Sequence, residues 1–356
     1  MNSRERVLTA LKRTGKPDRT PFEISWGSFS PMLMRTYREK TGSDLSPEEY
    51  FDYDTRFVFP EPTKKKTDFE KFYRDKNLPG DVHIDEWGVG YIPTQYEIQS
   101  PKYHPLESMT TVEEINAFSW PDLDEDYRYD AVIKSAEAYH KRGYAVCGDM
   151  AQTIFETAWL MRNMSQLMID FVLNEDIVHA ICENITRIRI KQARLYAKAG
   201  VDILRLGDDI VCQQGLMMSP ENYHTFFKQR LKMIIRAAKE ENPDIIIFMH
   251  SCGKVEDVID DLIDAGVEVL NPLQPECNDL KMIHEKYKDR LSFWGGIGVQ
   301  LVMPFGTPEE VIAKVKETRD ILGKEGGYLV APAHILDPSV PWDNVMAYIE
   351  AAKGLK

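Results

Sequence analysis

The stretch that decides the fold is Asp244–Gly253, with the sequence DIIIFMHSCG. Its five consecutive apolar residues, Ile245–Met249, predict a strand that is buried on both faces, because such a run leaves no side for water. The strand stops at a histidine and a cysteine two residues apart. Residues at that spacing project to the same side of an extended chain, so His250 and Cys252 are expected to enter one pocket.

Outward from this stretch, strand-like and helix-like segments alternate along the chain. The expected strands begin near residues 22, 55, 144, 202, 245, 267, 291 and 327. Strands that alternate with helices form a parallel sheet with crossover connections, and eight such units close a barrel. No GxGxxG motif follows the first strand and no GxxxxGK[ST] motif occurs, which disfavours the dinucleotide-binding and P-loop folds. We therefore expect an α/β protein, a (β/α)8 TIM barrel that forms a single domain over residues 1–356.

Residues from about 28 to 120 are the least regular part of the chain. They are rich in proline, tyrosine and charge, and a long segment of this kind in a compact enzyme is typical of a lid or an interface. Glu86–Tyr91 alternates like a small hairpin that lies over the barrel. The basic run Lys64–Lys66 is typical of a solvated surface turn, with a site for a substrate phosphate as the alternative.

Composition excludes several classes of partner. The formal net charge is −13, from 57 acidic and 44 basic residues, so a nucleic-acid partner is not expected. Five cysteines without a CxxC motif indicate a reducing cytoplasm rather than a disulfide scaffold. No run of about 18 apolar residues and no signal-peptide pattern occurs, so we expect a cytoplasmic protein that does not enter a membrane.

Polar and aromatic residues gather where the predicted strands end, the place where barrels of this type build their active sites. The residues at these positions are Trp26, Asp149, Arg205, Asp208, Asp209, His250, Cys252, Asn271, Gln274, Trp294 and His334. Of these, Trp26, Arg205, Asn271, Gln274 and Trp294 are the candidates for substrate binding. The two tryptophans are either core residues or flat walls for an aromatic ligand.

A metal site is one interpretation of His250 and Cys252, since thiolate and imidazole are preferred ligands of zinc. The alternative is a hydrogen-bonded histidine beside a small buried thiol. His334 follows the last strand and supplies a possible third ligand. Three protein ligands and an open fourth position are typical of a catalytic zinc site.

Three carboxylates are the candidates for catalytic residues. Asp208 and Asp209 are adjacent at a strand end, so one is expected to face the pocket while the other caps the next helix. Glu156 lies in a helical stretch and either reaches the site or has a surface role. Arg205 is costly to bury without a carboxylate, so it either forms a structural pair or holds an anionic or hydroxylated substrate.

Several segments together resemble the uroporphyrinogen decarboxylase superfamily, mainly over residues 144–352. They are DILRLGDD, QQGLMMSPENYHTFFKQRLKMII, MHSCGKVEDVIDDLIDAGVEVLNPLQPE, RLSFWGGIGVQ and GGYLVAPAHILDPSVPWDNV. The resemblance implies a single-domain (β/α)8 barrel and a homodimer. The superfamily includes the haem-pathway decarboxylase and zinc-dependent methyltransferases that exchange a methyl group with a corrinoid protein.

The motifs favour the methyltransferase branch of this superfamily. The decarboxylase has an arginine-rich segment of the type RQAGR after its first strand, whereas residues 24–31 here contain no arginine. The methyltransferases have HxC, which His250 and Cys252 match, and a cysteine after the last strand, where this chain has His334. Asp208, Asp209 or Glu156 is the alternative third ligand.

The resemblance thus implies a zinc-dependent methyltransferase. It would exchange a methyl group between a small substrate, a thiol or a methyl ether, and a corrinoid (methylcobalamin) carried by a partner protein. One alternative is a metal-free decarboxylase of a small or tetrapyrrole carboxylate, with Arg205 on the carboxylate. Another is a non-catalytic protein that binds a corrinoid or a tetrapyrrole.

Overall fold

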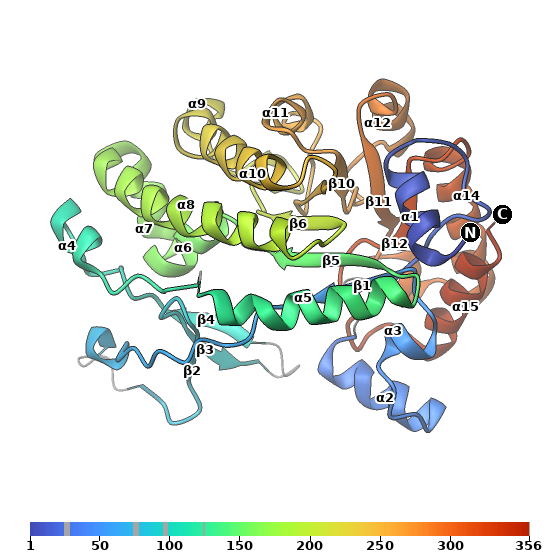
Figure 1. The fold of residues 1–356 in the computed structure, drawn as a ribbon, viewed down its shortest axis with the longest axis horizontal. Helices are drawn as coiled ribbons and strands as arrows, with labels where there is room; N and C mark the ends of the chain where they lie inside the picture. Colours follow the sequence, from blue (N-terminus) through green and yellow to red (C-terminus); the bar gives the residue numbers. More distant parts are fainter. Residues whose placement is uncertain (25–28, 74–77, 95–98, 124, 356) are drawn as a thin grey trace.

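The centre of the computed structural model is a curled sheet of seven parallel strands. The structure describes residues 1–24, 29–73, 78–94, 99–123 and 125–355. Neighbouring strands in the sheet follow the order of the chain (Figure 1): β1 (Thr55–Val58), β5 (Ala145–Met150), β6 (Ile203–Gly207), β9 (Ile246–His250), β10 (Val269–Asn271), β11 (Ser292–Ile297) and β12 (Tyr328–Pro332). Seven of the eight expected strands are therefore confirmed, including the buried run before His250.

At the eighth place, where a strand was expected to begin near residue 22, the described residues form a short bridge. The end of that expected strand, including Trp26, lies outside the described residues. Phe22 pairs in parallel with Val330 of β12. On the other side, the Asp54 N–H, just before β1, donates to the Phe22 carbonyl at 3.1 Å. The preceding Pro21 has no N–H to extend a ladder. The chain around Phe22 thus connects the two edge strands and closes the barrel.

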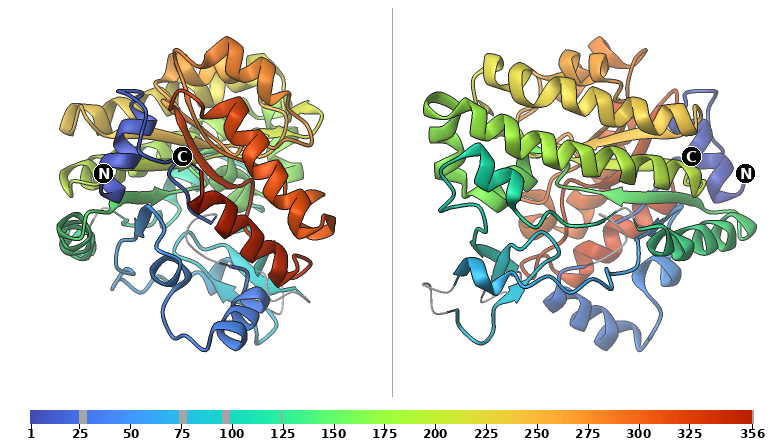
Figure 2. Two further views of the ribbon diagram at one scale, coloured as in Figure 1. Left: turned by 90° about the vertical axis from the view of Figure 1, so that its right-hand side faces the viewer. Right: turned by 60° about the vertical axis from the view of Figure 1, so that its left-hand side comes forward.

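Helices cover the outside of the barrel, as expected for crossover connections. They are α5 (Asp126–Lys141), α8 (Glu175–Lys198), α10 (Gln229–Glu241), α11 (Ile259–Ala265), α12 (Leu280–Tyr287), α14 (Pro308–Leu322) and α15 (Trp342–Lys353). Helices α8 and α10 run side by side, as do α14 and α15 (Figure 2). Shorter elements lie between them: α6 (Phe155–Arg162), α7 (Met164–Leu173), β7 (Val211–Cys212), β8 (Gly215–Leu216), α9 (Pro220–Asn222), a π-helical turn η3 (Tyr223–Lys228) and α13 (Val302–Phe305).

The amino-terminal helix α1 (Ser3–Leu11) closes the end of the barrel at which the strands begin. Its Val7 and Leu11 belong to one buried cluster with Phe248 and Trp294 from the barrel interior. Both chain termini lie near α1 (Figure 1). The opposite end, where the strands stop, is therefore the end that remains for a site.

Much of the segment 28–120 forms small elements outside the barrel sheet. They are α2 (Pro31–Thr41), α3 (Pro47–Tyr50), a 3-10 turn η2 (Glu70–Tyr73), β2 (His83–Ile84), β3 (Gly90–Pro93), β4 (Gln99–Tyr103) and α4 (Val112–Ala117). The expected hairpin is present, because β2, β3 and β4 form an antiparallel sheet. Within the described residues, no helix combines the length and the apolar character needed to cross a bilayer.

Candidate active site

His250, Cys252 and His334 come together where β9 and β12 end, and we refer to them as the donor trio. One ligand atom from each of the three lies within 4.8 Å of the others. The Cys252 Sγ atom is 3.2 Å from Nε2 of His250, so the two side chains do enter the same space. The structure thus brings together all three residues that the sequence predicts as metal ligands.

The orientation of the His250 ring is set by the neighbouring strand β10. The Asn271 side-chain N–H donates to the Trp294 carbonyl at 2.8 Å, which leaves its Oδ1 facing His250. Oδ1 lies 2.5 Å from Nδ1 of His250, so Nδ1 carries the proton and donates it. Nε2 is then the lone-pair nitrogen, and it points at Cys252. Asn271 therefore orients a member of the donor trio rather than lining open space.

The two adjacent aspartates point in different directions, as predicted. Asp209 faces the donor trio, where its Oδ1 accepts the Cys252 N–H at 2.7 Å and lies 3.7 Å from His250 Nε2. Asp208 turns the other way and accepts the N–H groups of Ile154 and Glu156 at 2.8 and 3.0 Å. It thus stabilises the start of α6, a helix earlier in the chain, whereas the sequence predicted a cap on the following helix.

Glu156 reaches the same turn from the first turn of α6. One of its carboxylate oxygens accepts the Asp209 N–H at 3.2 Å. Burial, followed by the nearby charges of Asp209 and Asp208, raises the pKa of Glu156 from 4.5 to about 9. Burial also raises the pKa of Asp208 to about 6. At neutral pH, Glu156 is therefore a neutral acid that holds a proton beside the donor trio.

Burial acts on the donor trio as well. It is the largest cause that lowers the pKa of His250 to about 3, and the positive charge of Arg205 adds to it. His334 is exposed, yet desolvation by the groups packed around its ring also lowers its pKa, and the charge of Arg205 adds to this. Burial raises the pKa of the Cys252 thiol far above its ordinary value. Both imidazoles are thus neutral, the form in which they bind metals.

Arg205 and Trp294, two of the predicted substrate-binding residues, are buried and already have partners within the protein. The Arg205 guanidinium forms an ion pair with Asp149 of the neighbouring strand β5, and the arginine is 8% exposed. Trp294 is 1% exposed, lies edge-on to Phe248 and donates its indole N–H to Glu23 at 2.9 Å. Trp26 lies outside the described residues.

A cavity of about 510 Å³ opens next to the donor trio. Cys252, His334 and the predicted substrate residue Gln274 line it, together with Val211, Cys212, Gln213, Gly253, Val299, Gln300, Ala333, Ile335 and Asp337. Sequence reasoning missed most of this wall, including Asp337. The signal was its place only three residues after His334, in the same strand-end loop.

The small sheet β2–β4 is connected to the loop that positions Glu156. The guanidinium of Arg189 lies 4.9 Å from the ring centroid of Trp87, in the turn between β2 and β3. The same guanidinium donates to the carbonyls of Gln152 and Thr153. The turn between β2 and β3 is therefore linked through Arg189 of α8 to the segment just before α6, as a lid over this part of the mouth would be.

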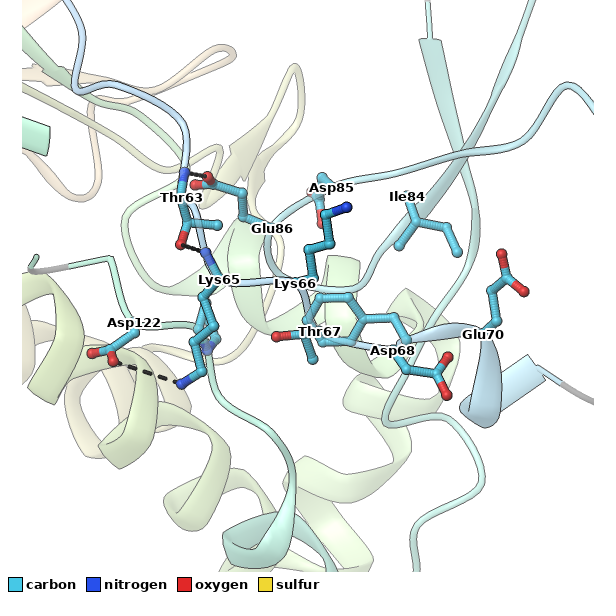
Figure 3. A pocket seen from close by; sticks show the side chains of 12 residues that line it. Thr63, Lys65, Lys66, Thr67, Asp68, Glu70, Ile84, Asp85, Glu86 and Asp122 are labelled. Atoms are coloured by element: carbon cyan, nitrogen blue, oxygen red, sulfur yellow. Dashed lines mark hydrogen bonds and ion pairs between the residues drawn. The ribbon is translucent and has the colours of Figure 1, made fainter.

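A second cavity lies in the amino-terminal segment (Figure 3). It has a volume of about 420 Å³, and its wall includes Lys65 and Lys66 of the basic run. Lys65 is 3.6 Å from Asp122, and Glu86 accepts the Thr63 N–H at 2.6 Å. Because acids on the same wall balance the lysines, we assign no phosphate site to this run.

The protein is a closed α/β barrel of parallel strands, and polar side chains converge where the strands end. This arrangement is typical of TIM-barrel enzymes. Within that class, the family model for uroporphyrinogen decarboxylase (URO-D) matches residues 88–355. The chain belongs to the uroporphyrinogen decarboxylase family.

Relatives in this family carry two kinds of name. The chain is 25% identical over 167 residues to the methylcobamide:CoM methyltransferase MtaA of Methanosarcina barkeri, which is 47% of this chain and 45% of that one. It is 21% identical over 180 residues to a uroporphyrinogen decarboxylase of Prochlorococcus marinus, covering 51% and 49% of the two chains. The chain thus spans about half the length of these curated relatives, and they support an enzyme.

A solved methyltransferase from Methanosarcina mazei shares the fold. It superposes with a TM-score of 0.67 at 16% identity and covers 99% of this chain and 98% of that one. At this identity the match supports the barrel architecture and nothing finer. The choice between methyl transfer and decarboxylation therefore depends on the residues of the candidate active site.

Proposed function

We propose that this protein is a zinc-dependent methyltransferase that exchanges a methyl group between a small thiol or methyl ether and a corrinoid carried by a partner protein. The observation that carries the proposal is the convergence of His250, Cys252 and His334 within 4.8 Å. The methyltransferase relative supports the same chemistry.

The donor trio fits a zinc ion by its chemistry and by its surroundings. Two imidazoles and one thiol are ligands that zinc prefers. The Nδ1–H of His250 is already held by Asn271, and such a hydrogen bond is the usual support of a metal-binding histidine. The cavity beside Cys252 and His334 leaves room for a substrate in the fourth position. His250, Cys252 and His334 would therefore hold the ion.

A bound zinc ion would supply a deprotonated thiol at neutral pH, or polarise the oxygen of a methyl ether. The chain's own groups prepare for this chemistry. Asp209 accepts the Cys252 N–H and so fixes the backbone that carries the thiol. We propose that the proton of Glu156 is available to a leaving oxygen or thiol, and that Asp208 holds Glu156 in place through its backbone N–H. The lid sheet would exclude water from this side of the mouth.

Metal analysis and a methyl-transfer assay test the proposal together. The purified protein should contain about one zinc per chain and should demethylate methylcobalamin in the presence of a thiol. Cys252→Ala should lose both the zinc and the activity. Cys212→Ala, which changes a cysteine in the same cavity but outside the donor trio, should keep the zinc. A folded wild-type protein without zinc after zinc reconstitution, or a Cys252→Ala protein that retains it, would refute the proposal.

A metal-free decarboxylase is the second candidate, favoured by the decarboxylase relative and by Arg205 near the site. It would need Arg205 to bind a carboxylate. The ion pair with Asp149 already compensates that charge, which weakens this reading. Release of carbon dioxide from a small carboxylic acid by zinc-free protein would support the decarboxylase instead.

A further inference from the structure

The cavity beside the donor trio has a polar wall that the proposed mechanism does not use. Three glutamines, Gln213, Gln274 and Gln300, and the acid Asp337 line it. Among the described residues that line this cavity, Asp337 is the one carboxylate, and no lysine or arginine is among them. The remaining wall residues, apart from the donor trio, are small, apolar or a thiol. A ligand in the cavity therefore meets amide groups and one carboxylate.

Asp337 is held in place and remains open to a ligand. Its Oδ1 atom accepts the N–H of Ser339 at 2.7 Å and also the hydroxyl of the same serine. The residue is exposed on the side of the cavity. Asp337 follows His334 by three residues, and both line the same cavity. A ligand that fills this cavity therefore contacts Asp337 as well as His334 and Cys252.

Further carboxylates lie behind the cavity wall. A side-chain oxygen of Glu276 accepts the Gln300 N–H at 3.2 Å. Asp209 accepts the N–H of Cys252 at 2.7 Å. The lysine next to the wall, Lys254, has its Nζ atom 4.0 Å from Glu256, which partly balances its charge. Arg205, whose positive charge acts on His250 and His334, is compensated by its ion pair with Asp149. In the metal-free protein, the electrostatic potential of the cavity should therefore favour a cation.

We propose that the substrate is a small amine-bearing thiol or methyl ether, and that Asp337 binds its positively charged amine. The thiol or ether end of this molecule is inferred from the proposed methyl transfer, so that part rests on the proposed function. The preference for a positive charge is a property of the cavity itself. An ammonium group donates charge-assisted hydrogen bonds to a carboxylate, and Gln274 and Gln300 offer further amide oxygens. A sulfonate or carboxylate at the same place would be repelled.

A series of two-carbon thiols tests the proposal during turnover. Cysteamine, 2-mercaptoethanol and 2-mercaptoethanesulfonate differ chiefly in carrying a cation, a neutral group and an anion. With methylcobalamin as donor, kcat/KM should fall in that order. An exposed ion pair is worth about two- to fivefold, so Asp337→Asn should reduce the cysteamine-to-sulfonate ratio by at least that factor. Because the intrinsic thiol reactivities cancel between wild type and variant, this change of ratio measures Asp337 alone.

The control is Asp320→Asn, the same chemical change on the outer helix α14. It should leave the ratio at the wild-type value. Gln300→Lys adds a positive charge to the cavity wall and should raise kcat/KM for the sulfonate. Equal ratios in wild type and Asp337→Asn, or a wild type that prefers the sulfonate, would overturn the proposal.

Chemical labelling of Cys212 tests the charge preference without zinc or turnover. The thiol is exposed and lines the same cavity. Aminoethyl and sulfonatoethyl methanethiosulfonate are a cationic and an anionic reagent of equal length, and their rates are normalised to free cysteine. The cationic reagent should label Cys212 faster, by about two- to fivefold, and Asp337→Asn should remove this advantage.

The labelling arm separates the two proposals. If no thiol is methylated while the labelling preference depends on Asp337, the proposed methyl transfer fails and the cation-selective cavity stands. If thiols are methylated but neither ratio responds to Asp337→Asn, the methyl transfer stands and the amine-binding role of Asp337 is wrong.

Discussion

Replacing Glu156 with glutamine is expected to remove a pH dependence of stability from the metal-free protein. Burial and the neighbouring aspartates raise the pKa of this carboxyl from 4.5 to about 9 in the folded chain. Between these two values the folded protein holds a proton that the unfolded chain has released. The free energy of unfolding therefore falls as pH rises through this window.

The size of the effect follows from one proton. Each pH unit inside the window is worth about 1.4 kcal/mol, so the wild type should lose up to about 2.7 kcal/mol more than Glu156→Gln between pH 6 and pH 8. Glutamine has the shape of the neutral acid and can still accept the Asp209 N–H. The two proteins should therefore have similar stability below about pH 4.5 and diverge progressively above it.

Urea unfolding at a series of pH values measures this difference directly. Metal-free protein is used so that zinc binding adds no pH dependence of its own. Glu317→Gln, an exposed glutamate on α14, is the matched control and should follow the wild-type curve. Parallel curves for wild type and Glu156→Gln would show that Glu156 ionises normally in the folded protein, and the assignment of a stored proton would then be wrong.

Three further predictions concern the framework around the site. Asn271→Leu removes the acceptor of the His250 N–H and should weaken zinc binding by about 10- to 100-fold without unfolding the barrel. Competition with a chelator measures the zinc affinity. An unchanged affinity would mean that the His250 ring needs no such partner. Asp170→Ala leaves the buried Arg162 guanidinium without the carboxylate that lies 2.7 Å from its Nε atom. The free energy of unfolding in urea should fall by about 3–5 kcal/mol. A loss below about 1 kcal/mol would contradict this buried ion pair. Gly148→Ala places a Cβ atom 2.4 Å from the Tyr196 ring in the wall of the barrel. The free energy of unfolding should therefore fall by about 1–3 kcal/mol. An unchanged stability would show that the Tyr196 ring can move aside without cost.

The donor trio shows how far local sequence rules reach. His250 and Cys252 were predictable as a pair because the two-residue period of a strand acts within a few residues of chain. His334 joins this pair from a distant part of the sequence. The family resemblance suggested this, and the closure of the barrel brings the residues together. Asp208 shows the opposite outcome: its cap role was predicted, but the helix it caps comes before it in the sequence, since β5 and β6 are neighbours in the sheet.

The sequence by itself determined the alternation of strands and helices, the place where each strand ends and the polar character of those ends. These properties depend on apolar runs and on backbone geometry between near neighbours. Only the tertiary structure decided that Arg205 pairs with Asp149, that Trp294 fills the barrel interior, and that Asp337 lines the cavity. Their positions depend on strand register and barrel closure, which join residues far apart in the chain and leave no periodic signal in it.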